Sequence, residues 1–167
     1  MAKKFWSEFG KLLPHMEFLG RKPREKDAIN QLLDVGYHHL ANVVKGILNK
    51  YEMPTVMGLL HVARNADSTP LVYDLMEMFR SDIVETEVLK FLRLKKKKLE
   101  TAQDEISHFL HEINERLDKK YYLKEFQACR TYRYYMEVQI LKFMKAVNRE
   151  EVFGPITLPN RHENRCS

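Results

Sequence analysis

Apolar residues recur at helical spacing along most of this 167-residue chain. The clearest stripe runs from Asp27 to about Lys50, and it predicts a central core helix. Gly36 lies within this stripe, where a glycine costs a helix about 1 kcal/mol in propensity. Its presence predicts that another stretch of backbone approaches the helix closely at this point.

The other stripes predict an all-α fold of about six helices, with no sheet of consequence. The first stripe is rich in aromatic residues, and docking onto the core explains it better than anchoring at a membrane surface. Another helix begins at Pro70, because proline suits the first helical position and Ser68 and Thr69 offer capping hydroxyl groups. A bend near Ser81 would let this segment continue helically. The stripes cover residues 2–13, 27–50, 70–92, 101–120 and 121–147, the last as one helix or a helix pair.

One helical domain, residues 1–150, accounts for nearly all of the chain and is large enough to bury a core. Residues 151–167 contain two prolines and no helical periodicity, so we interpret them as a C-terminal tail. The sequence contains no internal repeat, no glycine-rich phosphate loop and no Ser/His/Asp or Cys/His arrangement. Neither phosphate-loop chemistry nor nucleophilic catalysis is therefore predicted.

The balance of charge favours an anionic partner without identifying one. Lys and Arg number 28 against 23 Asp and Glu, which gives a net charge of +5. Three basic clusters could contact DNA phosphates, although each also has a structural explanation: a solvated loop, a solvated helix face, or basic residues beside partly buried tyrosines. The clusters are Arg21, Lys22 and Arg24; Lys95, Lys96, Lys97 and Lys98; and Arg130 and Arg133.

Only two cysteines, Cys129 and Cys166, are present, and their spacing is not that of paired metal ligands. A disulfide is therefore not expected, and a reducing cytoplasm is the simplest compartment. We find no signal peptide, and no apolar run approaches the ~20 residues needed to span a bilayer. These observations predict a cytoplasmic protein with no membrane association.

The stretch from Gly58 to Arg80 holds the candidate chemistry. His61 follows a short apolar run, and the helix that begins at Pro70 carries Asp74 and Glu77 three positions apart. At about 100° per residue, both carboxylates fall on the face opposite the apolar stripe of that helix. Imidazole and carboxylate donors from separate elements suit a divalent cation. A solvated helix face and a structural histidine explain the same residues without any metal.

Two blocks of sequence resemble the CRISPR-associated integrases, the metal-dependent subunits that insert new spacers into CRISPR arrays. One block, over residues 58–80, reads GLLH, a short loop and PLVYDLMEMFR; the other, over residues 27–37, reads DAINQLLDVGY. Both occur in the family's order and at about its spacing, and the resemblance extends to about Val147. Compared with that family, the chain is expected to begin inside the catalytic domain, without the β-rich N-terminal domain and without one metal-binding glutamate.

The resemblance implies a metal-dependent DNA endonuclease and integrase that uses Mg²⁺ or Mn²⁺. It implies that residues 1–150 form a metal- and DNA-binding domain, with His61, Asp74 and Glu77 as the catalytic set. His61 and Glu77 would be metal ligands, and Asp74 an acidic residue beside the metal. Arg80 is a further candidate for contact with DNA. The implied partners are DNA, as spacer precursor and CRISPR repeat, a small ferredoxin-like second adaptation protein, and a second copy of the chain in a homodimer.

The missing glutamate supports a second interpretation, a catalytically incomplete helical module that binds DNA or a partner protein. Two protein donors and water hold a hard cation only weakly, because each lost carboxylate removes charge from the site. A third interpretation, an unrelated helical interaction domain, would require both sequence blocks to be coincidental, and it is the least favoured.

Overall fold

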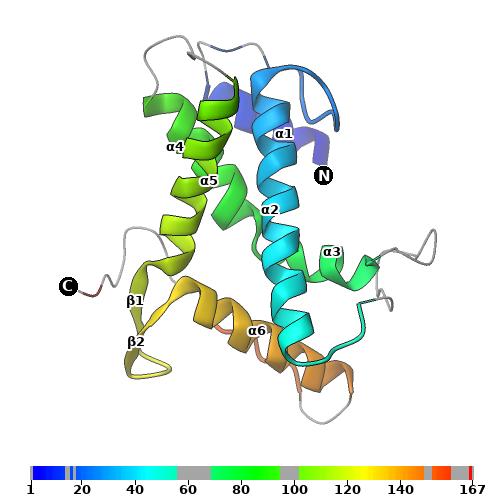
Figure 1. Cartoon of the computed structure of the whole chain (residues 1–167), viewed down its shortest axis with the longest axis vertical. Coiled ribbons are helices and arrows are strands. Elements are labelled where there is room, and N and C mark those ends of the chain that lie inside the picture. The colour runs from blue at the N-terminus through cyan, green and yellow to red at the C-terminus, as the bar shows by residue number, and fades with distance from the viewer. Residues whose placement is uncertain are drawn as a thin grey trace. The chain divides into compact units, whose positions relative to one another are not determined.

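The computed structural model describes residues 2–13, 16, 18–55, 69–94, 102–148, 152–158 and 166. The chain divides between Ile113 and Asn114 into two compact units. The described residues form six α-helices, one π-helix and one small sheet, which confirms the predicted, mainly helical fold (Figure 1). The predicted boundary between a domain and a tail at residue 150 is not tested by this division and stays a prediction.

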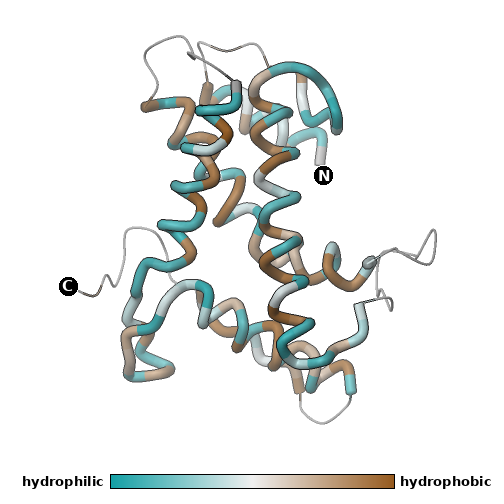
Figure 2. The backbone as a smooth tube through the Cα atoms, viewed as in Figure 1, coloured by the Kyte–Doolittle hydropathy of each residue, from teal (hydrophilic) through white to brown (hydrophobic). Residues whose placement is uncertain are grey.

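The first unit is built around α2 (Ala28–Lys50), the core helix that the sequence predicts. Asp27 caps this helix, because its carboxylate accepts the backbone N–H of Asn30 at 3.0 Å. Helix α2 contacts α3, η1 and α4, and Figure 2 shows hydrophobic and hydrophilic residues alternating along its length. The elements of this unit are α1 (Ala2–Lys11), α2, α3 (Pro70–Met76), the π-helix η1 (Ser81–Glu85), α4 (Thr86–Leu94) and the first part of α5 (Ala102–Asp118).

Helix α1 buries most of its aromatic side chains, as expected for a helix that docks on a core. The rings of Trp6 and Phe9 lie edge to face with 5.3 Å between centroids, and Phe18 lies 5.7 Å from Phe9. Trp6 and Phe9 are both buried. Within the part of the chain that the structure describes, no helix is both long enough and apolar enough to cross a membrane.

Helix α3 begins with Pro70 at its first position, as predicted, but Thr69 makes no side-chain capping bond. Ser68 lies outside the described residues. The α-helical pattern gives way to the π-helix η1 at Ser81, where the sequence predicts a bend. A π-helix adds one residue to a turn and so changes which side chains face a neighbouring helix.

Gly36 does mark a close approach to α2, but the approaching groups are side chains and not backbone. A Cβ atom at this position would lie 2.5 Å from Val84 Cγ1 and 3.3 Å from Phe109 Cε1. Both neighbours are fully buried, so neither has room to retreat. The glycine therefore lets side chains from η1 and α5 pack directly against the backbone of α2.

The second unit contains a β-hairpin, so the expectation of a helix over residues 121–131 is wrong. Lys120 and Tyr122 are exposed whereas Tyr121 and Leu123 are buried, which is the two-residue period of a strand. In the sequence, four residues are too few to distinguish this period from helical spacing. The elements are the end of α5, the antiparallel strands β1 (Lys120–Leu123) and β2 (Ala128–Thr131), and α6 (Tyr132–Val147).

The tyrosines of this unit divide between core and surface. Tyr121, Tyr132 and Tyr135 are fully buried, whereas Tyr122 and Tyr134 are each 39% exposed. The hydroxyl of Tyr135 shares its single proton between a backbone carbonyl of each strand, 2.9 Å away in both cases, and so fastens α6 to the hairpin. The interpretation of these tyrosines as core residues is thus confirmed for three of them.

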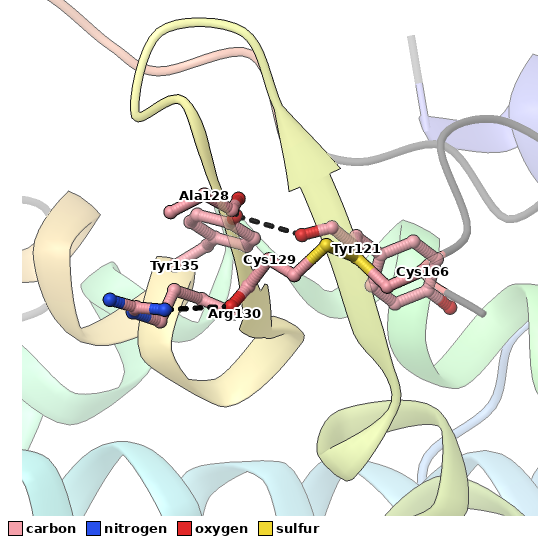
Figure 3. Close-up of a disulfide and its surroundings, with 6 residues drawn as sticks. All are labelled: Tyr121, Ala128, Cys129, Arg130, Tyr135 and Cys166. Atoms are coloured by element: carbon pink, nitrogen blue, oxygen red, sulfur yellow. Dashed lines mark hydrogen bonds between the residues drawn. A yellow bond between two sulfur atoms is a disulfide. The ribbon is translucent and has the colours of Figure 1, made fainter.

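A disulfide joins Cys129 of β2 to Cys166, and it overturns the expectation of no disulfide (Figure 3). The backbone N–H of Cys166 also donates to the carbonyl of Lys120, at 3.5 Å. The cysteines are 37 positions apart, and their spacing gave no sign of pairing because closeness depends on how the chain returns to the hairpin. The disulfide and the hydrogen bond hold Cys166 to both strands.

Replacing Gly36 by Ala should destabilise the chain by about 1–3 kcal/mol, because the new Cβ overpacks against Val84 and Phe109. Gly46 provides a matched control, since it lies in the same helix and no atom lies within 4 Å of a Cβ added there. Gly46→Ala should stabilise the chain by about 0.5–1 kcal/mol through helix propensity. Urea unfolding followed by circular dichroism measures both changes, and equal effects would contradict the packing argument.

Replacing both cysteines by serine should lower the free energy of unfolding by roughly 3–4 kcal/mol, because the bridge restricts the unfolded chain between residues 37 positions apart. The measurement is urea unfolding of the oxidised chain, the double variant and the dithiothreitol-reduced chain, of which the last two should agree. Two free thiols in the folded, oxidised protein would show that this pairing is wrong.

Candidate functional site

The two predicted carboxylates of α3 lie in different environments. Glu77, at the C-terminal end of the helix, has a side chain that is 42% exposed, whereas Asp74 is only 8% exposed. The expectation that both point away from the packing surface is therefore wrong for Asp74. Helix α3 has only seven residues and packs against α2, and on the face opposite its apolar stripe Asp74 is covered while Glu77 is not.

His61, the other predicted metal ligand, lies outside the described residues. Its proximity to Glu77 stays a prediction. Among the residues that the structure does describe, no three His, Cys, Asp or Glu side chains form a group able to hold a metal ion. Glu77 is thus the predicted ligand whose surroundings can be analysed.

Arg80 lies between two carboxylates. Its Nε atom is 2.9 Å from Glu77 Oε2 and 3.7 Å from Glu85 Oε1. The side chain of Glu85 is only 4% exposed, so the two carboxylates differ strongly in their access to water. Because a guanidinium group stays charged and carries several N–H donors, one arginine can serve both the surface carboxylate and the buried one.

Tyr37 of α2 supplies a hydrogen bond to the buried carboxylate. Its hydroxyl donates to Glu85 Oε1 at 2.7 Å. Burial, followed by the charge and hydrogen bonding of Glu85, raises the pKa of Tyr37 well above its ordinary value of 10.0, although Arg80 and Arg21 act in the opposite direction. Tyr37 therefore remains a protonated donor throughout the physiological range.

Two arginines lie over the ring of Tyr37, with Arg21 at 5.4 Å and Arg80 at 5.7 Å from its centroid. Arg21 is held in place by neighbours on α2: it donates to Asn30 Oδ1 at 3.0 Å and forms an ion pair with Asp34. Its side chain is only 13% exposed. We refer to Arg21, Tyr37, Glu77, Arg80 and Glu85 as the Tyr37 cluster.

The sequence analysis missed Glu85 as a member of this cluster. Tyr37 lies in one of the two blocks that carry the family resemblance, and Glu77 and Arg80 lie in the other. Glu85 follows outside both blocks, and its separation from Glu77 matches no ligand motif. Nothing in the sequence distinguishes it from an ordinary solvated glutamate.

The predicted DNA-binding residues have different surroundings, and the structure does not test whether they bind DNA. Two are exposed in the loop before α2, and two make contacts within the second unit: Arg130 lies 5.8 Å from the Tyr134 ring centroid, and Arg133 lies 3.0 Å from Asp118. The full set is Arg21 and Arg80 in the Tyr37 cluster, Lys22 and Arg24 in the loop, Arg130 and Arg133, with Lys95, Lys96, Lys97 and Lys98 outside the described residues.

A pocket of about 220 Å³ is lined by residues of α4 and α5, apart from the Tyr37 cluster. Lys90 in its wall forms an ion pair with Glu112 and lies 3.5 Å from Glu87 Oε2. The hydrogen bond from Lys90 lowers the pKa of Glu112. This ion pair joins α4 to α5 in the wall of the pocket.

Within the Tyr37 cluster, Glu77 supplies one accessible donor of the kind that a divalent cation needs. A carboxylate oxygen is a hard donor of the kind that Mg²⁺ and Mn²⁺ prefer. The Arg80 guanidinium occupies Oε2 of this carboxylate, so a cation bound there would displace it. The fold and the cluster together define a helical protein with an accessible carboxylate, Glu77. Its neighbour Arg80 also lies beside the buried carboxylate of Glu85.

The family model of CRISPR associated protein Cas1 matches residues 1–128, and the chain belongs to the Cas1 family. The CRISPR-associated endonuclease Cas1 of Mycobacterium tuberculosis is 31% identical over 93 residues, which are 54% of this chain and 27% of that protein. The CRISPR-associated endonuclease Cas1 1 of Saccharolobus solfataricus is 35% identical over 96 residues, or 55% of this chain and 27% of that protein. The matches thus span about a quarter of the length of these relatives.

Two solved structures share the fold. A Cas1 protein from Thermotoga maritima matches with a TM-score of 0.76 and 18% identity, over 91% of this chain and 52% of that chain. A casposase bound to integration product matches with a TM-score of 0.80 and 22% identity, over 99% of this chain and 50% of that chain. At these identities the likeness concerns the fold alone, and it confirms the predicted fold class.

Replacing Tyr37 by Phe should lower the free energy of unfolding by about 1–3 kcal/mol, because the buried carboxylate of Glu85 loses its hydrogen bond. Tyr122→Phe is the matched control, because Tyr122 is exposed and should change stability by no more than about 0.5 kcal/mol. Urea unfolding at neutral pH measures both.

The same pair of chains tests the raised pKa of Tyr37. The stabilisation is fully present below the unfolded pKa of about 10 and is lost as the pH rises further, because the unfolded state then releases a proton that the folded state keeps. The advantage of the unchanged chain over Tyr37→Phe should shrink above about pH 10 by up to about 1.4 kcal/mol per pH unit. A difference that stays constant from about pH 9 to pH 11 would show that the pKa is not raised.

Proposed function

We propose that this chain acts as part of a metal-dependent DNA endonuclease and integrase of CRISPR spacer acquisition. Membership of the Cas1 family supports the proposal, and curated relatives carry the name CRISPR-associated endonuclease. The observation that carries it is the accessible Glu77 carboxylate. This residue lies in the block that resembles the integrases, and it pairs with Arg80 of the Tyr37 cluster. The casposase that shares the fold was solved bound to an integration product, so a DNA partner is consistent with this architecture.

In the proposed reaction, the 3′-hydroxyl oxygen of a spacer precursor attacks a phosphodiester of the repeat DNA. A new P–O bond forms as the attacking hydroxyl loses its proton, and the bond to the neighbouring 3′-oxygen of the repeat breaks, that oxygen taking up a proton to become the new 3′-hydroxyl. Bound Mg²⁺ or Mn²⁺ would polarise the phosphate and stabilise the developing negative charge. His61 and Glu77 are the proposed ligands, with Asp74 beside them, and Arg80 holds the Glu77 carboxylate before a cation binds.

DNA is the proposed partner, as spacer precursor and as CRISPR repeat. We assign phosphate contact first to Lys22 and Arg24, which are exposed in the described loop. Arg21 is committed to contacts within the protein, and so is less suited to leave for DNA. A small ferredoxin-like second adaptation protein, a homodimer and a cytoplasmic location complete the proposal.

A catalytically incomplete DNA- or partner-binding module is the second candidate function. One observation favours it: the matches span about a quarter of the length of the curated relatives. In this alternative the Tyr37 cluster stabilises the fold, and turnover requires residues from outside this sequence.

The decisive experiment is strand transfer of a short 3′-hydroxyl DNA into a CRISPR-repeat plasmid with Mn²⁺. His61→Ala and Glu77→Ala should each lower the rate by at least about 100-fold, because each removes a proposed ligand. His38→Ala and Glu115→Ala are matched controls on exposed residues, and they should leave the rate unchanged.

Loss of activity in the first two variants, with retained activity in the controls, would support the endonuclease and integrase. An inactive unchanged chain that still binds DNA in a mobility-shift assay would instead support the incomplete module. If the chain neither reacts with nor binds DNA, both candidate functions are wrong for this chain alone.

A further inference from the structure

The two carboxylates beside Arg80 offer it two alternative positions. In this structure the guanidinium is closer to the accessible Glu77, at 2.9 Å, than to the buried Glu85, at 3.7 Å. Glu85 is not wholly dependent on Arg80, because the hydroxyl of Tyr37 donates to it at 2.7 Å. The buried carboxylate of Glu85 therefore keeps a hydrogen bond while Arg80 is closer to Glu77. A small movement of the Arg80 side chain would bring its guanidinium into direct contact with Glu85.

A positive charge at Glu77 would displace the arginine. A cation bound to the carboxylate removes the negative charge that holds Arg80 there, and like charges a few ångströms apart repel each other. Release into water would leave the guanidinium without a partner, whereas Glu85 lies within 4 Å and has a carboxylate oxygen to offer.

Tyr37 provides a surface along which this movement can occur. Its ring lies 5.7 Å from the Arg80 guanidinium, while Arg21 covers it at 5.4 Å and is itself held by Asn30 and Asp34. Arg21 is thus held by two partners on α2, whereas Arg80 contacts the ring with a carboxylate on either side of it.

We propose that Glu85 is a positioning residue that receives Arg80 when Glu77 binds a divalent cation. The inference rests on the proposed function in one respect, the assignment of Glu77 as a metal ligand. Before binding, Arg80 neutralises the accessible carboxylate; after binding, it neutralises the buried one. Before the exchange the two carboxylates share one arginine, and after it each has its own positive partner. The exchange thus lowers the free-energy cost of removing the arginine from the metal site.

The first test needs no metal. Glu77→Gln keeps the shape of the side chain and removes the negative charge that a bound cation would neutralise. A crystal structure of this variant should show Arg80 in direct contact with Glu85, at about 2.8–3.0 Å instead of 3.7 Å. An Arg80 that stays where it is, or that turns into solvent, would overturn the proposal.

The second test is Mn²⁺ affinity, measured by electron paramagnetic resonance on the full chain. Glu85→Gln should weaken binding about tenfold, because Arg80 then has no second partner and competes for Glu77. Arg80→Gln should bind Mn²⁺ at least as tightly as the unchanged chain, since the competitor is gone. In the Arg80→Gln background, Glu85→Gln should have less than about a twofold effect.

This double-mutant cycle separates the exchange from a general effect of charge. If Glu85→Gln weakens binding equally in both backgrounds, Glu85 acts only as a nearby negative charge, and the proposal is wrong. Glu112→Gln is the matched control: this carboxylate also pairs with a cation, Lys90, in the same unit, and its removal should leave Mn²⁺ affinity unchanged.

Failure of the proposed function is distinguishable from failure of this inference. If the unchanged chain binds no Mn²⁺, the metal-ligand role of Glu77 fails for this chain, yet the Glu77→Gln structure still decides whether Glu85 receives Arg80. If Mn²⁺ binds but Arg80 does not move in that structure, the proposed function stands and the exchange is refuted.

Discussion

A carboxylate buried away from water is stable only when hydrogen bonds and opposite charge replace its hydration. Glu85 imposes this requirement on the first unit, and two neighbours meet it: Tyr37 with a hydrogen bond and Arg80 with charge. Tyr37 comes from α2, Glu85 from η1, and Arg80 from the turn before η1. The requirement therefore fixes α2 against η1 and also fixes the guanidinium that reaches the surface at Glu77. The candidate site and the core depend on the same contacts.

Helical periodicity was sufficient to predict α2, because a stripe of more than six turns can hardly arise from any other structure. The two sequence blocks were sufficient to place the chain in its family. The burial of Asp74 could not be predicted, since it depends on what covers a helix of only seven residues. Glu85 was missed for a related reason: its role comes from Tyr37 on another helix, 48 positions away.

In the second unit, the pattern of hydrophobic and polar positions was not sufficient to predict the elements. Its strands have four residues each, too few for a two-residue period to be distinguished from a helical one. The pairing of Cys129 with Cys166 then depends on the hairpin itself, because β2 presents the first cysteine to a distant segment of the chain. The number and spacing of the cysteines alone therefore could not reveal this pairing.

Gly36 and Tyr37 are neighbours on α2, and Val84 and Glu85 are neighbours on η1. The contact between Gly36 and Val84 is therefore adjacent to the hydrogen bond between Tyr37 and Glu85. The distance between α2 and η1 at Gly36 determines whether the Tyr37 hydroxyl can reach the Glu85 carboxylate. A larger residue at position 36 would move η1 outward and stretch that bond, although it touches only apolar atoms. Through this adjacency, a family member that loses the glycine would need a smaller residue at position 84 to keep its arginine beside the carboxylate.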